Sequence, residues 1–144
     1  MKMTVKSEGP IIEVTSDKHK PFSKENLDKA LEKTTQFAKE LRRDWDDNNW
    51  FPCGFVSLKA ESKGDLMNFI KKNGETDGLY YYYGILTAWK RCATGYNINI
   101  AYRKIDLHDA IVQQCMAYKQ RVAEFLQKEL ALMHQKISVN TMID

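Results

Sequence analysis

The chain has 144 residues, of which 43% are apolar and 28% are charged, and its formal net charge is +3. This length corresponds to one domain of about 100–200 residues that can bury a sizeable core. The composition excludes general disorder, a collagen-like repeat and a low-complexity chain, and so mild a charge does not by itself identify a nucleic-acid binder.

The first 22 residues are predicted to form an N-terminal tail, with an edge strand in the β-prone run 11–15. No apolar run follows the lysines at the start, so a secretory signal is not indicated. No stretch reaches the ~18 consecutive apolar residues of a transmembrane helix. Cys53, Cys92 and Cys115 are odd in number and widely spaced, which indicates reduced thiols. We therefore expect a cytoplasmic protein without membrane contact.

A long amphipathic helix is predicted after Ser23, a good N-cap residue. Apolar residues recur at three- and four-residue steps from Leu27 to Trp45, as one buried helix face requires. The other face carries mixed charges, which is typical of a solvated surface. A strand over 50–60 and a short helix over 64–73, ended by Gly74, are expected to follow.

Residues 79–104 are predicted to form a β-hairpin. The β-prone runs 79–90 and 96–104 flank a Gly-ended connection over 91–95. In the second run, strand alternation places Tyr96, Ile98 and Ile100 toward the core, and Asn97 and Asn99 away from it.

A second long helix is predicted from about residue 106 to 135, followed by a strand over 136–143. At ~1.5 Å per residue this helix would be about 40 Å long, more than the width of a small domain. We therefore expect it to bend, to end early, or to extend into a partner, for which a homodimer is the corresponding hypothesis.

The order of elements predicts an α+β fold for residues 23–144 as a single domain. A small, mainly antiparallel sheet, with the hairpin 79–104 at its centre, would be covered on one face by two long helices and one short helix.

No common catalytic or nucleotide-binding motif is present, whether a Gly-x-Ser-x-Gly elbow, a P-loop or a Gly-x-Gly-x-x-Gly turn. His19, His108 and His134 lack the i, i+4 spacing of a helical metal site. Cys53 would need a histidine nearby to act as a nucleophile, and a buried structural thiol is the simpler interpretation. The sequence therefore predicts no catalytic residue, no metal site and no cofactor, and it offers no positive support for an enzyme.

The strongest functional signal is the composition of the predicted hairpin. Residues 79–105 contain six of the seven tyrosines, four basic residues and no acidic residue, so this segment is more positive than the whole chain. Aromatic rings stack on bases, and Lys or Arg contacts phosphate. The predicted ligand-binding residues are Tyr80, Tyr82, Lys90, Arg91, Asn97, Asn99, Arg103 and Lys104.

Several short motifs occur in the order seen in a group of uncharacterised small phage-encoded proteins. The segment Cys53-Gly54-Phe55-Val56 resembles their Cys-Gly-Phe-Ala-Trp-Val-type strand, and the last residues, 140–144, resemble their Ser-Arg-(Leu/Met)-Asp-type ending. Between these lie Phe69 to Lys72, Tyr82-Tyr83-Gly84, Trp89 and Val122-Ala123-Glu124-Phe125-Leu126. The resemblance covers residues 50–144, although Val56-Ser57 stands in place of Ala-Trp and the arginine of the ending is absent. It implies a phage accessory protein that modulates host machinery, and it implies no catalytic residue.

Two functional hypotheses follow. The leading one is a non-enzymatic binding protein, a phage accessory or host-interaction factor, that engages a nucleic acid or a nucleotide-type signal through the basic, Tyr-rich hairpin. The alternative is an inhibitor of a host enzyme or defence system that docks through the hairpin or the long C-terminal helix. Tyrosine is also a favoured strand and interface residue, and Leu86 falls on the supposed polar side unless Gly84 marks a bulge.

Overall fold

The computed structural model describes residues 5–11, 19–46, 48, 53–61, 63–73, 75–76, 80–82, 86–92, 95–100 and 109–143. For residues 5–8, 75–76, 80–82, 86–92 and 95–100 it describes the course of the backbone. The elements in chain order are β1 (Val5–Glu8), α1 (Lys24–Asp44), β2 (Gly54–Glu61), α2 (Asp65–Asn73), β3 (Glu75–Thr76), β4 (Tyr80–Tyr82), β5 (Leu86–Cys92), β6 (Gly95–Ile100), α3 (Ala110–Gln114), α4 (Met116–Ala131) and β7 (Ile137–Ile143).

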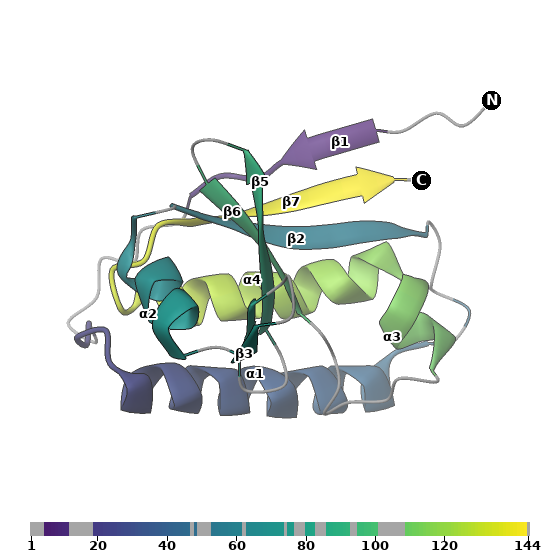
Figure 1. The fold of residues 1–144 in the computed structure, drawn as a ribbon. Helices are drawn as coiled ribbons and strands as arrows, with labels where there is room; N and C mark the ends of the chain where they lie inside the picture. The colour runs from purple at the N-terminus through teal and green to yellow at the C-terminus, as the bar shows by residue number, and fades with distance from the viewer. Residues whose placement is uncertain are drawn as a thin grey trace.

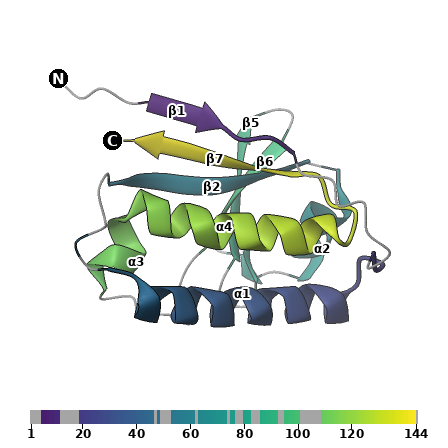
Figure 2. The same cartoon turned by 180° about the vertical axis from the view of Figure 1, so that it is seen from behind.

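The described strands form one antiparallel sheet in the order β1-β7-β2-β6-β5-β4-β3. In Figure 1, α4 lies against β2 and β7, and α1 lies on the far side of α4. The view from behind shows the same three layers (Figure 2). The α+β class and the antiparallel sheet are therefore confirmed. The expected packing differs in one respect, because α1 packs on α4 rather than directly on the sheet.

Helix α1 begins as its sequence predicts. The Ser23 side chain accepts a hydrogen bond from the backbone N–H of Asn26 at 3.1 Å and caps the first turn. Leu27 and Leu31 on its apolar face are fully buried. Phe37 stacks on Phe125 of α4 with ring centroids 4.4 Å apart, so this face meets α4.

The second long helix is divided at Cys115, which is a correction to the single helix predicted over 106–135. Cys115 has an extended backbone, with φ −72° and ψ 107°, and forms an isolated antiparallel bridge with Cys53. Asp109 starts the short helix α3 by accepting a hydrogen bond from the Ile111 N–H at 3.0 Å. Helical periodicity is a local signal, whereas this break depends on a contact with a distant strand. The expectation that the helix bends or ends early is met.

The apolar residues of α4 are covered within a single chain. Tyr118, Val122, Leu126 and Leu130 are each exposed by 1% or less. They are shared between the sheet on one side and α1 on the other (Figure 1). This two-sided packing accounts for the excess of apolar residues without a second copy of the chain.

The run 79–90 is not the single strand that was predicted. Tyr82 pairs with Leu86, so the chain reverses direction between β4 and β5. The intervening sequence contains Gly84, a residue that weakens the interior of a strand. Strand β5 then pairs with β6, and these two strands are joined by residues 93–94 rather than by 91–95. The predicted hairpin is therefore part of a larger meander.

The N-terminal edge strand lies earlier than expected. Strand β1 pairs with β7 at the edge of the sheet, whereas most of the predicted strand 11–15 lies outside the described residues. The segment after β1 is held by Gln127 of α4, whose Nε2 donates to the Pro10 carbonyl at 2.9 Å and to the Ile137 carbonyl at 2.8 Å.

We expect Gln127→Leu to lower the free energy of unfolding by about 1–3 kcal/mol, because the Ile137 carbonyl, in a buried bond, and the Pro10 carbonyl, in a partly buried bond, lose their donor. Urea denaturation measures this loss, and hydrogen exchange should become faster at residues 5–11. The control is Gln36→Leu on the exposed face of α1, for which a change within about 0.5 kcal/mol is expected. Equal losses in both variants would contradict the role assigned to Gln127.

Candidate functional site

The structure places six of the eight predicted ligand-binding residues on three neighbouring strands. Tyr80 and Tyr82 are on β4, Lys90 and Arg91 are on β5, and Asn97 and Asn99 are on β6. Arg103 and Lys104 lie outside the described residues.

The strand register assigns Tyr80 to the face of the sheet that packs on the helices. Residues directly opposite each other in an antiparallel pair share a face. Tyr80 is opposite Ala88, Ala88 is opposite Ile98, and Ile98 is opposite Leu58. Leu58 is fully buried in the core with α4. The register position of Ile98 therefore belongs to the row of Leu58, as its alternation predicts, and the position of Tyr80 belongs to the same row.

Lys90 occupies a register position on this same face. Lys90 is opposite Tyr96, which is opposite Ala60, and Ala60 is 3% exposed. Tyr82 is opposite Leu86, which alternates with Ala88 and Lys90 along β5. The register therefore groups Tyr80, Tyr82 and Lys90 together.

Asn97 and Asn99 belong to the opposite face. Asn97 is opposite Lys59 on one side and Trp89 on the other, and Lys59 is opposite Ser138. We call the side of the sheet that carries Ser57, Lys59 and Ser138 the open face, because no described helix covers it (Figure 1). In the register, Tyr80, Tyr82 and Lys90 therefore occupy a different row from the two asparagines. The pairing is shifted at the irregularity between Lys90 and Cys92, and a shift of one residue exchanges the faces.

A hollow lies on the open face where β2 and β7 run side by side. Its volume is about 230 Å³, and it is lined by Gly9, Ile11, Lys59, Ala60, Glu61, Lys136 and Ser138. Two lysines, one glutamate and one serine thus border it. We refer to it as the Lys59 hollow.

A second, smaller hollow of about 190 Å³ adjoins it and shares Glu61 and Lys136. It adds Lys63, Asp65 and His134 to the polar residues at this end of the sheet. The backbone amide of Leu66, the second residue of α2, is already satisfied here, because it donates to the Gln135 side chain at 3.2 Å. This part of the surface therefore contributes charge rather than an open helix terminus.

His19 and His134 meet at this end of the molecule although the sequence separates them widely. Their rings stack with centroids 4.3 Å apart and an angle of 12° between the planes. His134 has a φ of 60° and follows the last turn of α4. Its N–H donates to Ala131 and the Gln135 N–H donates to Leu130, the pattern of a Schellman helix end. Within the described ranges, no three His, Cys, Asp or Glu side chains are arranged to hold a metal ion.

The other end of the open face is more apolar. Phe55 lies two strand positions from Ser57 and is 56% exposed. Asn140, opposite Ser57, is 7% exposed, and its Oδ1 accepts no hydrogen bond from the part of the chain that is described. The open face thus combines an aromatic ring, amides, a hydroxyl and cations.

Sequence reasoning did not select Lys59, Lys136 or Ser138. The alternation Phe55, Ser57, Lys59, Glu61 is visible in the sequence and identifies one side of β2. The adjacency of β7, β2 and β6 is a property of the sheet order, which no local pattern reveals. The charge of each sequence segment is highest over β5 and β6. It does not reveal that Lys59 of β2 and Lys136, which precedes β7, line one hollow.

Comparisons of the chain with protein-family models, curated proteins and solved structures find no match. The resemblance to phage-encoded proteins therefore stays a prediction, and the function has to be argued from the surface itself.

Among the described helices, none is both long enough and apolar enough to cross a lipid bilayer.

Proposed function

We propose that the protein is a non-enzymatic binding protein that holds a phosphate-bearing partner, a nucleic acid or a nucleotide-type signal, on the open face of its sheet. The observation that carries the proposal is the Lys59 hollow, which is lined by Lys59 and Lys136 together with Ser138 and Glu61. Asn97 stands opposite Lys59 in the register and extends this group onto β6. The leading hypothesis from the sequence is thus kept, with its centre moved from the hairpin to β2 and β7.

The size of the hollow favours a phosphate group over an enclosed ligand. Ordinary small-molecule pockets measure about 300–1,000 Å³, whereas the Lys59 hollow measures about 230 Å³. A phosphate can be held by lysine ammonium groups and a hydroxyl while the remainder of the partner stays on the surface. That arrangement is compatible with a nucleic-acid strand that lies across the sheet.

Phe55 extends the proposed surface along β2. Phe55 and Lys59 are four residues apart on one face, so at ~3.3 Å per residue they are separated by about 13 Å. A base stacked on Phe55 and a phosphate at Lys59 are compatible with a single strand running along β2. Stacking and phosphate contact together are the usual means of binding single-stranded nucleic acid on an open sheet.

The biological setting is also part of the proposal. The resemblance over residues 50–144 supports a phage accessory factor that acts on host machinery. A phosphate-bearing signal or a nucleic acid of the host would then be the partner.

The test is a pair of charge reversals in the hollow, Lys59→Glu with Lys136→Glu. We expect the dissociation constant for a single-stranded oligonucleotide to rise by at least about tenfold, and the salt dependence to become shallower, because fewer phosphates are neutralised. Fluorescence anisotropy over a salt series measures both quantities. The matched control is Lys33→Glu with Lys39→Glu on the exposed face of α1, which changes the net charge equally and should leave affinity within about threefold.

Two results would overturn the proposed site. Equal losses of affinity in both double variants would mean that net charge alone drives binding. If the wild-type chain binds neither oligonucleotides nor nucleotides at low salt, the proposal of a phosphate-bearing partner is wrong. The variant Lys90→Glu with Arg103→Glu separates the two surfaces, because a loss confined to it would return the site to the hairpin.

The alternative function is inhibition of a host protein by docking. Phe55 and Ile11 support it, since they are exposed by 56% and 54% and are the large hydrophobic residues that stand out on the described surface. An apolar contact of this kind would hardly change with salt. Binding to a partner protein that persists at high salt and fails in Phe55→Ala would favour the inhibitor.

A further inference from the structure

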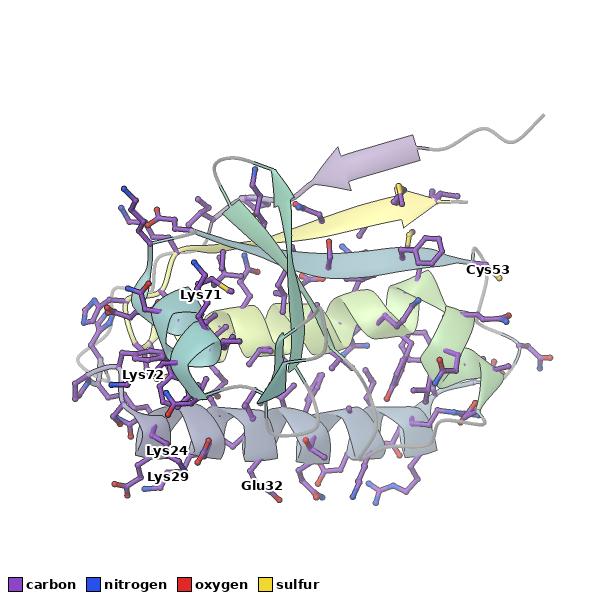
Figure 3. All side chains as sticks on the ribbon, in the orientation of Figure 1. Lys24, Lys29, Glu32, Cys53, Lys71 and Lys72 are labelled. Carbon is purple, nitrogen blue, oxygen red and sulfur yellow. The ribbon has the colours of Figure 1, made fainter. Side chains whose placement is uncertain are left out.

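A second cluster of reactive side chains lies at the far end of β2 from the Lys59 hollow. Cys53, at the end of β2 beside α3 (Figure 3), forms an isolated antiparallel bridge with Cys115. Cys53 is exposed, Cys115 is fully buried, and both are in the thiol form. The two residues are far apart in the sequence, and the break between α3 and α4 brings them together.

The bridge places the backbones of Cys53 and Cys115 directly opposite each other. The Cys115 N–H already donates to the Ile111 carbonyl at 3.0 Å, so we assign the two cysteines to a non-hydrogen-bonded pair. In such a pair the Cα atoms are about 4.5 Å apart and the side chains lie on the same side. Disulfides form at Cα separations of about 4.4–6.8 Å. A pairing of this kind brings two Cα atoms into the range over which a disulfide forms.

Lys119 supplies a positive charge at this cluster. Its Nζ donates to the Gly54 carbonyl at 2.7 Å and to the Gln113 carbonyl at 3.0 Å, which fixes it between β2 and α3. Burial lowers the pKa of Lys119, and the charges of Cys115 and then Cys53 act in the opposite direction and raise it. The ammonium group is thus electrostatically coupled to both sulfurs. A cation held here stabilises the negative charge that develops on sulfur during the reaction.

We propose that Cys53 and Cys115 form a peroxide-sensitive dithiol that a hydroperoxide converts into an intramolecular disulfide. The Cys53 thiolate attacks the peroxide, the O–O bond breaks, and an alcohol or water leaves with the second oxygen and takes up a proton. Cys53 then carries a sulfenic acid. The Cys115 thiol loses its proton and its sulfur attacks the Cys53 sulfur, the S–O bond breaks, and water leaves. Two electrons pass from the sulfurs to the peroxide, and the products are one disulfide, one alcohol and one water.

The exposure of the two thiols assigns their order of reaction. Cys53 can meet the oxidant, whereas Cys115 is reached only through Cys53. The disulfide would join β2 to the junction of α3 and α4 and would close a long loop, which restricts the unfolded chain. Oxidation would therefore stabilise this end of the molecule.

The experiment uses the full chain in its reduced form, treated with one equivalent of hydrogen peroxide and then with a maleimide. We expect intact mass to show the loss of the two thiol hydrogens, and peptide mapping to join residue 53 to residue 115 while Cys92 carries the maleimide. In Cys115→Ser, a sulfenic acid at Cys53 should persist and react with dimedone. In Cys53→Ser, no disulfide should form.

A second comparison tests the role of Lys119 without depending on a single variant. We expect disulfide formation to slow by about tenfold in Lys119→Met and to stay within about threefold in Lys119→Arg, because the arginine keeps the charge. Circular dichroism confirms that both variants fold. A disulfide that includes Cys92, a dimer linked through Cys53, or oxidation of Cys53 to a sulfinic acid without a disulfide would each overturn the proposal.

Discussion

Replacing Tyr118 by alanine is expected to lower the free energy of unfolding by about 3–5 kcal/mol, as for other large buried aromatic side chains. Tyr118 is fully buried between α4 and α1, and its hydroxyl donates to the Ala38 carbonyl at 2.6 Å. Trp45 packs on its ring edge to face, with centroids 5.6 Å apart. Removing the ring therefore opens a cavity where the outer helix is attached. Chemical denaturation at pH 7 measures the loss.

The same residue gives the stability of the protein a specific dependence on alkaline pH. Burial raises the pKa of Tyr118 well above its ordinary value; Arg42 acts to lower this pKa, and Asp109 to raise it. The unfolded chain releases this proton near pH 10, whereas the folded chain keeps it. The contribution to stability is therefore complete below about pH 10, and falls by about 1.4 kcal/mol for each further pH unit.

Tyr118→Phe should remove this dependence. At pH 7 the variant is expected to be less stable than the wild type by about 1 kcal/mol, because the Ala38 carbonyl loses its donor. The two stability curves should cross near pH 11, where the deficit is offset. All other titratable groups are present in both proteins, so their contributions cancel in the difference. Curves that stay parallel up to that pH would contradict the buried, protonated state assigned to Tyr118.

The helices that the sequence predicts well are those whose burial follows from their own periodicity. Leu27 and Leu31 of α1, and Leu66 and Ile70 of α2, are spaced so that one helix face is apolar, and each is exposed by 1% or less. The helix predicted over 106–135 has the same kind of stripe. Nothing local in that stripe indicates the extended backbone of Cys115, because its bridging partner is Cys53 on another element. Apolar periodicity predicts where a helical region lies, but it does not predict where a tertiary contact interrupts that region.

The sequence indicates the types of residue in the candidate site better than it indicates their position on the sheet. The excess of basic residues and tyrosines over 79–105 falls on strands β4, β5 and β6 of the sheet, and the alternation of Asn97 with Ile98 agrees with the register, which places the two residues in different rows. The faces of Tyr80 and Lys90 depended on the reversal after Tyr82 and on the irregularity after Lys90. Each of these features shifts the register, and a shift of one residue is invisible in composition.

The Lys59 hollow and the Cys53–Cys115 pair also depend on contacts between distant parts of the sequence, which no local pattern predicts. Lys59 and Lys136 line the same hollow because β2 and β7 are neighbours in the sheet. In the chain, β7 is the last strand and β2 is the second. Cys53 and Cys115 looked like isolated thiols because their spacing matches no motif. Strand β2 is the common element: one of its ends lines the Lys59 hollow, and the other carries Cys53.

The close packing of that second end leads to the other large stability effect. A Cβ atom built at Gly54 would lie 2.8 Å from the Met142 carbonyl oxygen and 2.9 Å from the Met116 sulfur. The Met116 side chain can move, but Met142 belongs to β7, which is held to β2 along its whole length. Glycine is therefore required here by the approach of the neighbouring strand.

We expect Gly54→Val to lower the free energy of unfolding by about 3 kcal/mol, at the upper end of what overpacking usually costs. Gly54→Ala should lie between this variant and the wild type. The control is Gly64→Ala, where the new Cβ would meet the Glu61 carbonyl at 3.4 Å, an ordinary contact, and where we expect no loss beyond about 0.5 kcal/mol. Because Cys53 precedes Gly54, the strain should also displace the Cys53–Cys115 bridge and slow formation of the disulfide. A stable Gly54→Val protein that still forms the disulfide at the wild-type rate would show that β2 and β7 separate more easily at this end than their pairing indicates.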